Sequence, residues 1–187
     1  GVDYRWDIEE KDTYSLLPQP KRGQQNMISV NNPLQLTSPK IKTREEIGKI
    51  VQEQRQKGKK IVTLNGCFDI LHIGHIKLIE EAKKQGDILI VGLNSDESVR
   101  QWKKLMLQQN WFKRPINSVI ARAEALAALT GVDFIEIFDE PDCLSFLENI
   151  KPDIHVNGED YGEHCIEAPL VKKYGGKIHI AKFVEGF

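Results

Sequence analysis

A short stretch near residue 70 carries side chains that could bind phosphate. It reads NGCFDILHIGH over residues 65–75, so that His72 and His75 flank Gly74. Imidazoles donate hydrogen bonds to anionic oxygens, and a helix beginning here would add free N–H groups and a partial positive charge. Glycine would let a ligand approach the backbone closely. These residue types favour nucleotide-phosphate binding, with stabilisation of the charge that grows on a phosphorus under attack.

Three other interpretations of this stretch stay open. The two histidines could bind a metal ion, although Cys67 is the only nearby candidate for a third ligand. They could instead cap a structural turn. The stretch could also be ordinary sequence between a strand and a helix. The residues alone do not decide between phosphate binding and these alternatives.

Apolar segments alternate with helical patterns along the rest of the chain. Strands are expected at residues 61–64, 88–93, 134–138, 154–156 and 178–183. Helices are expected after the capping box of Thr43 and Glu46, over 76–82, from Asp96, from Asn117 or Ser118 to 129, over 143–150 and over 169–174. Such alternation predicts an α/β fold with right-handed crossovers, a Rossmann-like, doubly wound, five-stranded parallel sheet. Ligands of such sheets bind at the carboxyl ends of the strands, and the histidines follow the first of these strands.

Composition excludes several classes of protein. The 187 residues contain 26 Lys and Arg against 27 Asp and Glu, and the net charge of -1 argues against a nucleic-acid binder. The longest unbroken apolar run covers only residues 88–91, far short of a membrane span, and no signal-peptide pattern opens the chain. Three widely spaced cysteines without a CxxC pair make a disulfide scaffold or a thiolate zinc site unexpected. We therefore expect a cytoplasmic protein without a structural metal.

The first 41 residues differ from the remainder. They show no sustained periodicity and contain four prolines, so this segment is expected to form an irregular N-terminal arm, with the folded domain at 42–187. Two interpretations of the arm stay open. It is either an extension without a packing role or an arm that lies on a partner subunit, anchored by its apolar side chains Tyr4, Trp6, Tyr14, Leu16 and Leu17.

The segment NGCFDILHIGH closely resembles the HxGH signature of the cytidylyltransferase-like nucleotidyltransferases, and the resemblance extends from about residue 60 to 187. Further blocks resemble the D-glycero-β-D-manno-heptose 1-phosphate adenylyltransferases in particular. They are NSDESV (94–99), RPIN (114–117), VD (132–133) with IFDE (137–140), KPD (151–153), GEDY (158–161) and YGG (174–176). In that family the domain stands alone or follows a sugar kinase, and this chain resembles the stand-alone form.

The resemblance implies a set of site residues. The implied catalytic residues are His72 and His75 at the ATP phosphates, Lys103 near the triphosphate, and Arg114 near the sugar phosphate or pyrophosphate. The implied nucleotide-binding residues are Cys67, Phe68, Asp69, Gly74, His75, Asn94, Asp96, Arg122, Asn157, Gly158, Asp160 and Gly186. Mg²⁺ would arrive with ATP, and no metal site is expected on the protein itself. A homo-oligomer is also implied.

Several of these residues have a simpler interpretation. Lys103 could be solvated surface, and Arg122 could lie on the exposed face of its helix. Asp96 could be a helix cap and Asp160 part of a turn. Nothing in the spacing of Cys67 calls for a nucleophile, so we interpret it as a packing residue.

The sequence also departs from the family pattern. The segment between Lys103 and Arg114 is longer than usual and rich in apolar residues, which predicts an extended helix, a lid over the nucleotide or a contact with the N-terminal arm. Asn157 stands where the family commonly has Lys, and Glu159 where it often has Gly, so the sugar-phosphate end of the site could differ. Gly186 opens what resembles the start of a C-terminal signature in which phosphate-binding Ser and Thr residues follow.

The expected function is transfer of AMP from ATP to a sugar 1-phosphate, D-glycero-D-manno-heptose 1-phosphate, by direct displacement at phosphorus. Two alternatives stay open. One is a cytidylyltransferase acting on glycerol 3-phosphate or a related alcohol phosphate. The other is a nucleotide-binding module without turnover, which the changes at Asn157 and Glu159 keep open and the intact His72 and His75 disfavour.

Overall fold

The computed structural model describes residues 35–105, 109–159 and 165–182. In these ranges six parallel strands form one sheet in the order β1-β4-β3-β2-β5-β6. The strands are β1 (Ile41–Lys42), β2 (Ile61–Gly66), β3 (Ile88–Asn94), β4 (Phe134–Phe138), β5 (Ile154–Gly158) and β6 (Lys177–Ala181). The helices are α1 (Arg44–Gln56), α2 (Ile73–Lys83), α3 (Asp96–Leu105), α4 (Val119–Ala127), α5 (Leu144–Ile150) and α6 (Ala168–Lys173), with a 3₁₀ turn η2 at Trp111–Lys113.

The predicted fold class is confirmed, with one more strand than expected. The additional strand, β1, has two residues, and Ile41 pairs with Ile135 of β4. A segment of this length has no periodicity from which it could be predicted. The boundary that we expect between residues 41 and 42 falls inside it.

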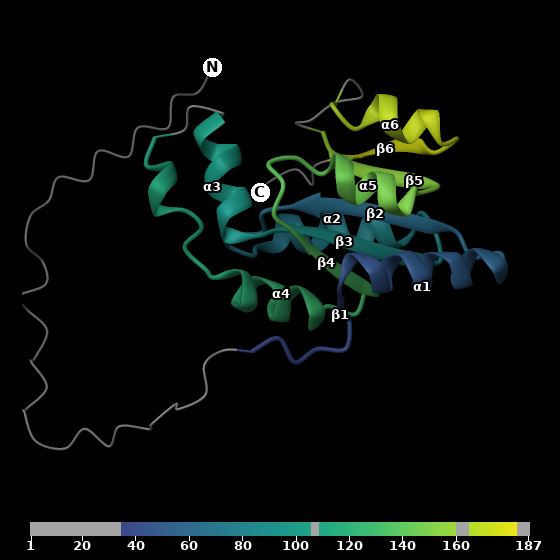
Figure 1. Cartoon of the computed structure of the whole chain (residues 1–187), viewed down its shortest axis with the longest axis horizontal. Helices are drawn as coiled ribbons and strands as arrows, with labels where there is room; N and C mark the ends of the chain where they lie inside the picture. Colours follow the sequence, from purple (N-terminus) through teal and green to yellow (C-terminus); the bar gives the residue numbers. More distant parts are fainter. Residues whose placement is uncertain (1–34, 106–108, 160–164, 183–187) are drawn as a thin grey trace, which may run out of the picture. The chain divides into compact units, whose positions relative to one another are not determined.

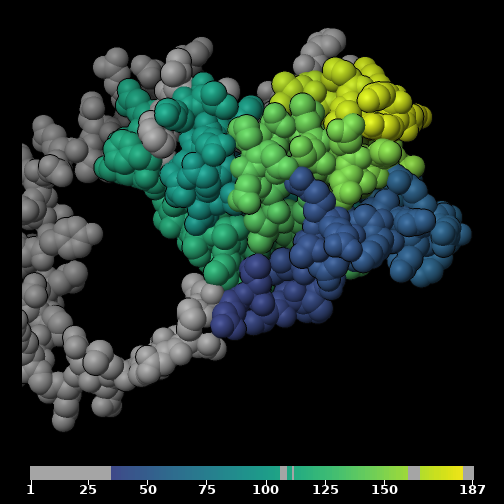
Figure 2. All heavy atoms as spheres, in the orientation of Figure 1, coloured from purple at the N-terminus to yellow at the C-terminus, as the bar shows by residue number. Residues whose placement is uncertain are grey.

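Helices cover both faces of the sheet, as Figure 1 shows with α1 and α5 in front of the strands and α2 behind them. On one face, Ile79 and Ala82 of α2 and Leu126 of α4 pack against apolar side chains of β2 and β3. On the other face, Ile47 of α1 and Phe146 of α5 do the same. The surface made by α1 and α5 is visible in Figure 2. Because the central strands are covered on both sides, they are apolar nearly throughout.

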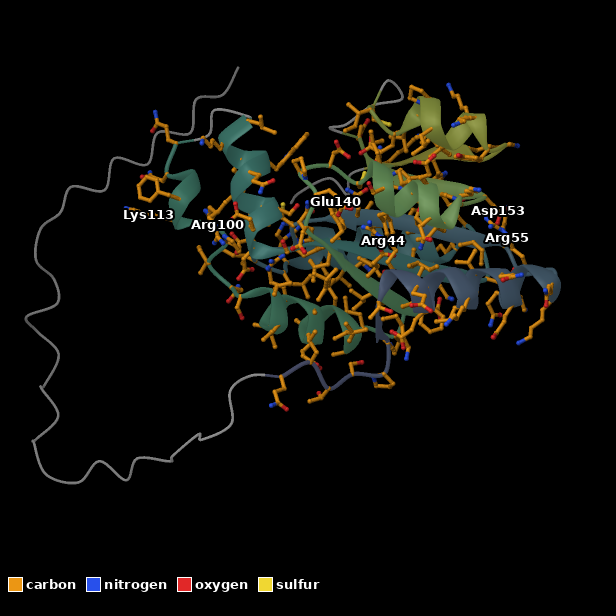
Figure 3. All side chains as sticks on the ribbon, viewed as in Figure 1. Arg44, Arg55, Arg100, Lys113, Glu140 and Asp153 are labelled. Atoms are coloured by element: carbon orange, nitrogen blue, oxygen red, sulfur yellow. The ribbon has the colours of Figure 1, made fainter. Side chains whose placement is uncertain are left out.

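Local sequence sets the ends of the helices. Thr43 and Glu46 form the predicted capping box of α1, and the Ser118 side chain caps α4. Arg44 then fixes α1 to β4, because its guanidinium contacts the fully buried Glu136 at 2.8 Å. The same guanidinium contacts Glu140 at 2.6 Å, just after β4 (Figure 3). Burial raises the pKa of Glu136, although the neighbouring Arg44 opposes this shift.

The order of the strands reverses beside β2. The chain proceeds from β2 through β3 to β4 on one side and from β5 to β6 on the other. A reversal of this kind leaves a crevice at the carboxyl ends of the two strands that flank it, here β2 and β5. The HxGH segment follows β2 directly, so the fold places it at this crevice.

Candidate active site

His72 is the N-cap of α2. Its Nδ1 accepts a hydrogen bond from the backbone N–H of Gly74 at 3.1 Å. With Nδ1 as acceptor, the neutral ring carries its proton on Nε2, which makes that atom a donor. A Cβ at position 74 would lie 2.9 Å from Cε1 of His72, so Gly74 allows the imidazole to fold back over the start of the helix. The glycine thus orients the histidine, besides leaving the backbone accessible.

His75 lies one turn further along α2 and stacks on His72. The ring centroids are 3.9 Å apart with an interplanar angle of 34°, and the edge of Phe68 meets His75 with centroids 5.2 Å apart. Burial, and then the proximity of His72, lowers the pKa of His75. An anion bound beside His75 would oppose this shift and favour the protonated ring.

The loop between β2 and α2 is held in a strained conformation at Phe68. Its φ of 45° lies in the left-handed region, which costs a non-glycine residue about 1 kcal/mol. The side chain is 5% exposed and belongs to the core beneath the loop. Buried packing of the ring thus stabilises a backbone conformation that directs residues 69–72 over the carboxyl end of β2.

Asp69 connects this loop to the loop before α4. Its carboxylate accepts hydrogen bonds from Arg114 Nη1 at 2.9 Å and from the backbone N–H groups of Ile116 and Asn117 at 2.6 and 3.2 Å. Although burial opposes the shift, the hydrogen bonds from Asn117, Arg114 and Ile116 lower the pKa of Asp69. Asp69, implied by the resemblance to bind the nucleotide, thus holds two loops together in this structure. Arg114, expected to reach an anion, here contacts Asp69.

Arg122 lies beneath the site, and the alternative that places it on an exposed helix face is wrong. The residue is 2% exposed. Its guanidinium donates to the carbonyl oxygens of Cys67, Asn94 and Asn117 at 2.6, 2.8 and 3.0 Å, and to Asp96 Oδ1 at 2.7 Å. One cation therefore joins the carboxyl ends of β2 and β3 to the start of α4.

A pocket of about 940 Å³ opens above these elements, within the size range of small-molecule sites. Nine of the predicted site residues line it: Cys67, Phe68, Asp69, His72, Gly74, His75, Lys103, Asn157 and Gly158. Four others, Asn94, Asp96, Arg114 and Arg122, are not among its lining residues. Asp160 and Gly186 lie outside the described residues.

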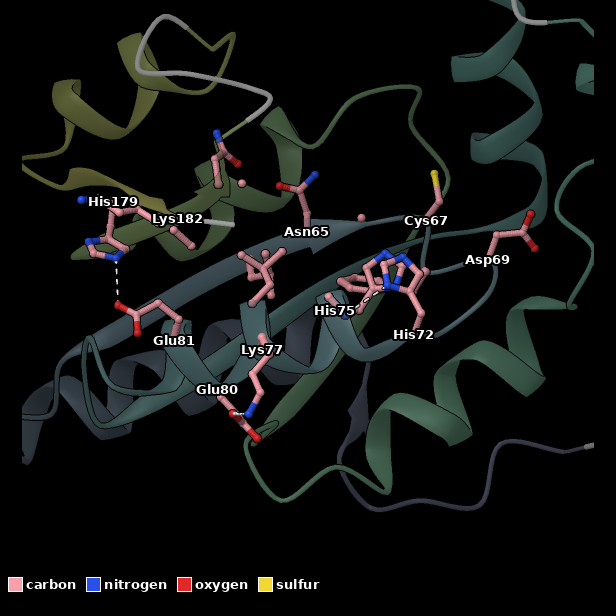
Figure 4. Close-up of a pocket in the computed structure, with 18 of the residues that line it drawn as sticks. Asn65, Cys67, Asp69, His72, His75, Lys77, Glu80, Glu81, His179 and Lys182 are labelled. Atoms are coloured by element: carbon pink, nitrogen blue, oxygen red, sulfur yellow. Dashed lines mark hydrogen bonds and ion pairs between the residues drawn. The ribbon is translucent and has the colours of Figure 1, made fainter. Parts of the chain in front are cut away.

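The pocket has a wall that sequence reasoning missed. Lys77 and Glu81 of α2 and His179 and Lys182 at β6 line it, and His179 Nε2 lies 3.3 Å from Glu81 Oε1 (Figure 4). Lys77 and Glu81 are four residues apart, so the sequence could predict that both lie on the same face of α2. Their proximity to β6 could not be read from the sequence.

Two further predictions can be compared with the structure. Burial raises the pKa of the Cys67 thiol, which favours the packing interpretation over a nucleophile. After Lys103, α3 is described as far as Leu105 and η2 begins at Trp111, so one helix does not run on to Arg114. Residues 106–108 lie outside the described residues.

Within the described ranges, no three His, Cys, Asp or Glu side chains are grouped so that they could hold a metal ion. In the same ranges no helix is long and apolar enough to cross a bilayer.

Two known proteins have sequences related to this chain. The bifunctional protein HldE of Geobacter metallireducens is 43% identical over 148 residues, which cover 79% of this chain and 29% of that protein. HldE of Campylobacter jejuni subsp. doylei is 47% identical over 149 residues, with the same two shares. The chain thus spans 29% of the length of these relatives.

Solved structures give the same result for the fold. A lipopolysaccharide core biosynthesis protein from Thermoplasma volcanium is 32% identical, with a TM-score of 0.52 over 68% of this chain and 98% of that one. Pantoate-beta-alanine ligase from Francisella tularensis shares the fold at 21% identity, with a TM-score of 0.53 over 76% of this chain and 66% of the ligase. A family model described as cytidylyltransferase-like matches residues 63–182. The chain belongs to the cytidylyltransferase-like family.

Proposed function

We propose that the protein transfers the AMP group of ATP to a sugar 1-phosphate, D-glycero-D-manno-heptose 1-phosphate, and releases pyrophosphate. The observation that carries this proposal is the stacked pair His72 and His75 at the start of α2, on the wall of a pocket at the carboxyl end of β2. The heptose acceptor is supported by the sequence blocks that resemble heptose 1-phosphate adenylyltransferases and by the similarity to proteins named HldE.

The reaction would be one displacement at the α-phosphorus of ATP. An oxygen of the sugar phosphate forms the new P–O bond while the bond to pyrophosphate breaks. The attacking phosphate is already ionised near pH 7, so no general base is required. Catalysis then consists of positioning the two substrates and stabilising the negative charge that accumulates on the phosphate oxygens.

The described residues suit these tasks. His72 Nε2–H and the imidazole of His75 would donate to oxygens of the reacting phosphates, and the N-terminus of α2 adds its partial positive charge. Lys103, which lines the same pocket, would contact the triphosphate. Asp69, Arg114 and Arg122 would act as positioning residues, because they hold the loops from which the histidines project. Mg²⁺ bound to the triphosphate would share the charge of the leaving pyrophosphate.

One observation keeps a second function open. Asn157 is 7% exposed and lines the pocket at a position where the family commonly has Lys. The absence of a cation at this position keeps a nucleotide-binding module without turnover as an alternative. A cytidylyltransferase acting on glycerol 3-phosphate is the other alternative, because it shares the HxGH segment and the fold.

Pyrophosphate release distinguishes these functions. The purified protein is assayed with Mg²⁺ and with ATP or CTP, each paired with the heptose 1-phosphate or with glycerol 3-phosphate. Release only with ATP and the heptose phosphate is the expected result. Release only with CTP and glycerol phosphate would replace the proposed substrates. If no pair of substrates gives pyrophosphate release, also with a chain extended past residue 187, the binding module is favoured.

The same proposal includes a cytoplasmic, homo-oligomeric protein with an N-terminal arm. The sequence predicts this arm over residues 1–41, but Ile41 belongs to β1 and thus to the folded domain. The resemblance to the adenylyltransferases is the support for the assembly. Light scattering of the full chain, compared with a chain beginning at residue 35, tests whether the arm contributes to it.

A further inference from the structure

The pocket has a second polar wall, on the opposite side of the sheet from the histidines. β2 and β5 pair in parallel with Thr63 beside His155, and Thr63 Oγ1 lies 2.9 Å from His155 Nδ1. Side chains alternate along a strand, so Asn65 and Asn157, two residues further on, follow this pair on the same face. Both amides line the pocket at the carboxyl ends of their strands.

Glu167, which precedes α6, completes this wall. It lines the same pocket and is 6% exposed. One carboxylate oxygen, Oε1, accepts from the Cys143 thiol at 3.3 Å. Burial, and then the charge of Glu167, raises the pKa of Cys143, so the thiol keeps the proton that it donates.

Four side chains of this wall have a buried polar atom without a hydrogen-bond partner. Three of them belong to residues that line the pocket, namely Glu167 Oε2, Asn157 Nδ2 and Asn65 Oδ1, and the fourth is His155 Nε2, whose residue does not line it. Buried polar groups are nearly always satisfied in folded proteins, and each exception has a cost in free energy that folding does not recover. Three exceptions on the wall of one pocket indicate a ligand that would satisfy them.

The chemistry of the three atoms selects the ligand group. A carboxylate oxygen and an amide oxygen accept hydrogen bonds, whereas the Asn157 amide nitrogen donates. A phosphate would be repelled by the Glu167 carboxylate. A hydroxyl both donates and accepts, and two adjacent hydroxyls could satisfy all three atoms at once.

We propose that Glu167, Asn157 and Asn65 form a hydroxyl-binding subsite that takes a vicinal diol of a substrate, opposite the histidines that hold the phosphates. This inference rests on the proposed function, because both proposed substrates carry such a diol, one on the ribose of ATP and one on the heptose. In the view of Figure 4, Asn65 lies between the histidine pair and Lys182.

Binding measurements test the subsite without requiring turnover. Calorimetric titration gives the dissociation constants of ATP, 2′-deoxy-ATP, 3′-deoxy-ATP and the heptose 1-phosphate for the wild type and for Glu167→Gln and Asn157→Leu. The substitution Glu53→Gln changes an exposed carboxylate on α1 and serves as the matched control. Thermal unfolding tests whether each variant is folded. If Glu167→Gln is not folded, the titrations of Asn157→Leu test the subsite.

Two outcomes support the subsite and identify its ligand. If it takes the ribose, the wild type binds ATP roughly 10- to 100-fold more tightly than the deoxy analogues, and the two variants lose this preference. If it takes the heptose, the deoxy analogues bind like ATP, and the variants bind the heptose phosphate roughly 10- to 100-fold more weakly. In both cases Glu53→Gln behaves as the wild type.

Variants that bind both substrates as the wild type does, with unchanged discrimination against the deoxy analogues, would overturn the subsite. A wild type that binds ATP without releasing pyrophosphate would refute the proposed reaction. The titrations of the variants would still decide whether the subsite exists. A wild type that binds neither substrate would overturn both.

Discussion

The Asp69 carboxylate accepts a hydrogen bond from Arg114 Nη1 at 2.9 Å, and this ion pair joins the loop that carries the histidines to the loop before α4. The side chain of Asp69 is 12% exposed, whereas that of Arg114 is 41% exposed. The aspartate is therefore the anchored member of the pair. Its position depends on two backbone N–H groups as well as on the arginine.

Removing the charge of Asp69 should reduce turnover without unfolding the protein. Asp69→Asn keeps the shape of the side chain but weakens its hold on Arg114 and on residues 116–117. A loosened loop would misplace the histidines, and we expect pyrophosphate release to fall roughly 10- to 100-fold. The control is Asp87→Asn, which alters a carboxylate that also binds a backbone N–H and a lysine. Equal rates for Asp69→Asn and the wild type would refute the positioning role.

Arg122 should be needed for stability. Arg122→Met leaves three carbonyl oxygens and the Asp96 carboxylate without their donor, and loss of one partner from a buried charged network costs about 3–5 kcal/mol. Urea denaturation measures the change in the free energy of unfolding. Arg100→Met removes an arginine that pairs with Glu97 on the surface of α3, and little change is expected there. If Arg122→Met changes the free energy of unfolding as little as Arg100→Met does, the buried network around Arg122 does not stabilise the protein.

Much of the fold could be predicted from the sequence, because its elements have local causes. Apolar strands, the capping box at Thr43 and the cap at Ser118 are properties of short segments. β1 escaped prediction because its two residues are held by pairing with β4, which is distant in sequence.

The site was predictable in part for the same reason. The HxGH segment is contiguous, so residue types and spacing indicated its chemistry. The burial of Arg122 depends on which face of α4 meets the sheet, and the contact of Glu81 with His179 depends on two elements about a hundred residues apart. The wall made by Asn65, Asn157 and Glu167 likewise depends on the pairing of β2 with β5. No local pattern encodes these relationships.

The buried His155 should make stability depend on pH. Burial lowers its pKa to about 4, against the opposing influence of Glu167, while the unfolded chain titrates near 6.5. Because the folded pKa is depressed, this contribution to stability is fully present above pH 6.5 and is lost as the pH falls toward 4. The loss across that window is on the order of 3 kcal/mol.

Urea denaturation between pH 4 and 7 measures this slope. His155→Gln, which cannot titrate, should flatten the slope in that interval. His179→Gln changes a partly exposed histidine and should keep the slope. If the free energy of unfolding of His155→Gln changes with pH as steeply as that of the wild type, the pH dependence comes from other groups.

The most direct test of the central claim is the rate of pyrophosphate release by His75→Ala with ATP, Mg²⁺ and the heptose 1-phosphate. The imidazole of His75 stacks on His72 at the start of α2, where it would stabilise the charge of the reacting phosphates. We predict that the variant is folded, as its thermal unfolding curve will show, and that its turnover is reduced by a factor of about 10²–10³. Loss of one oxyanion donor has an effect of this size in other enzymes. A folded His75→Ala protein with near-normal turnover would contradict the assignment of the histidine pair as the catalytic centre.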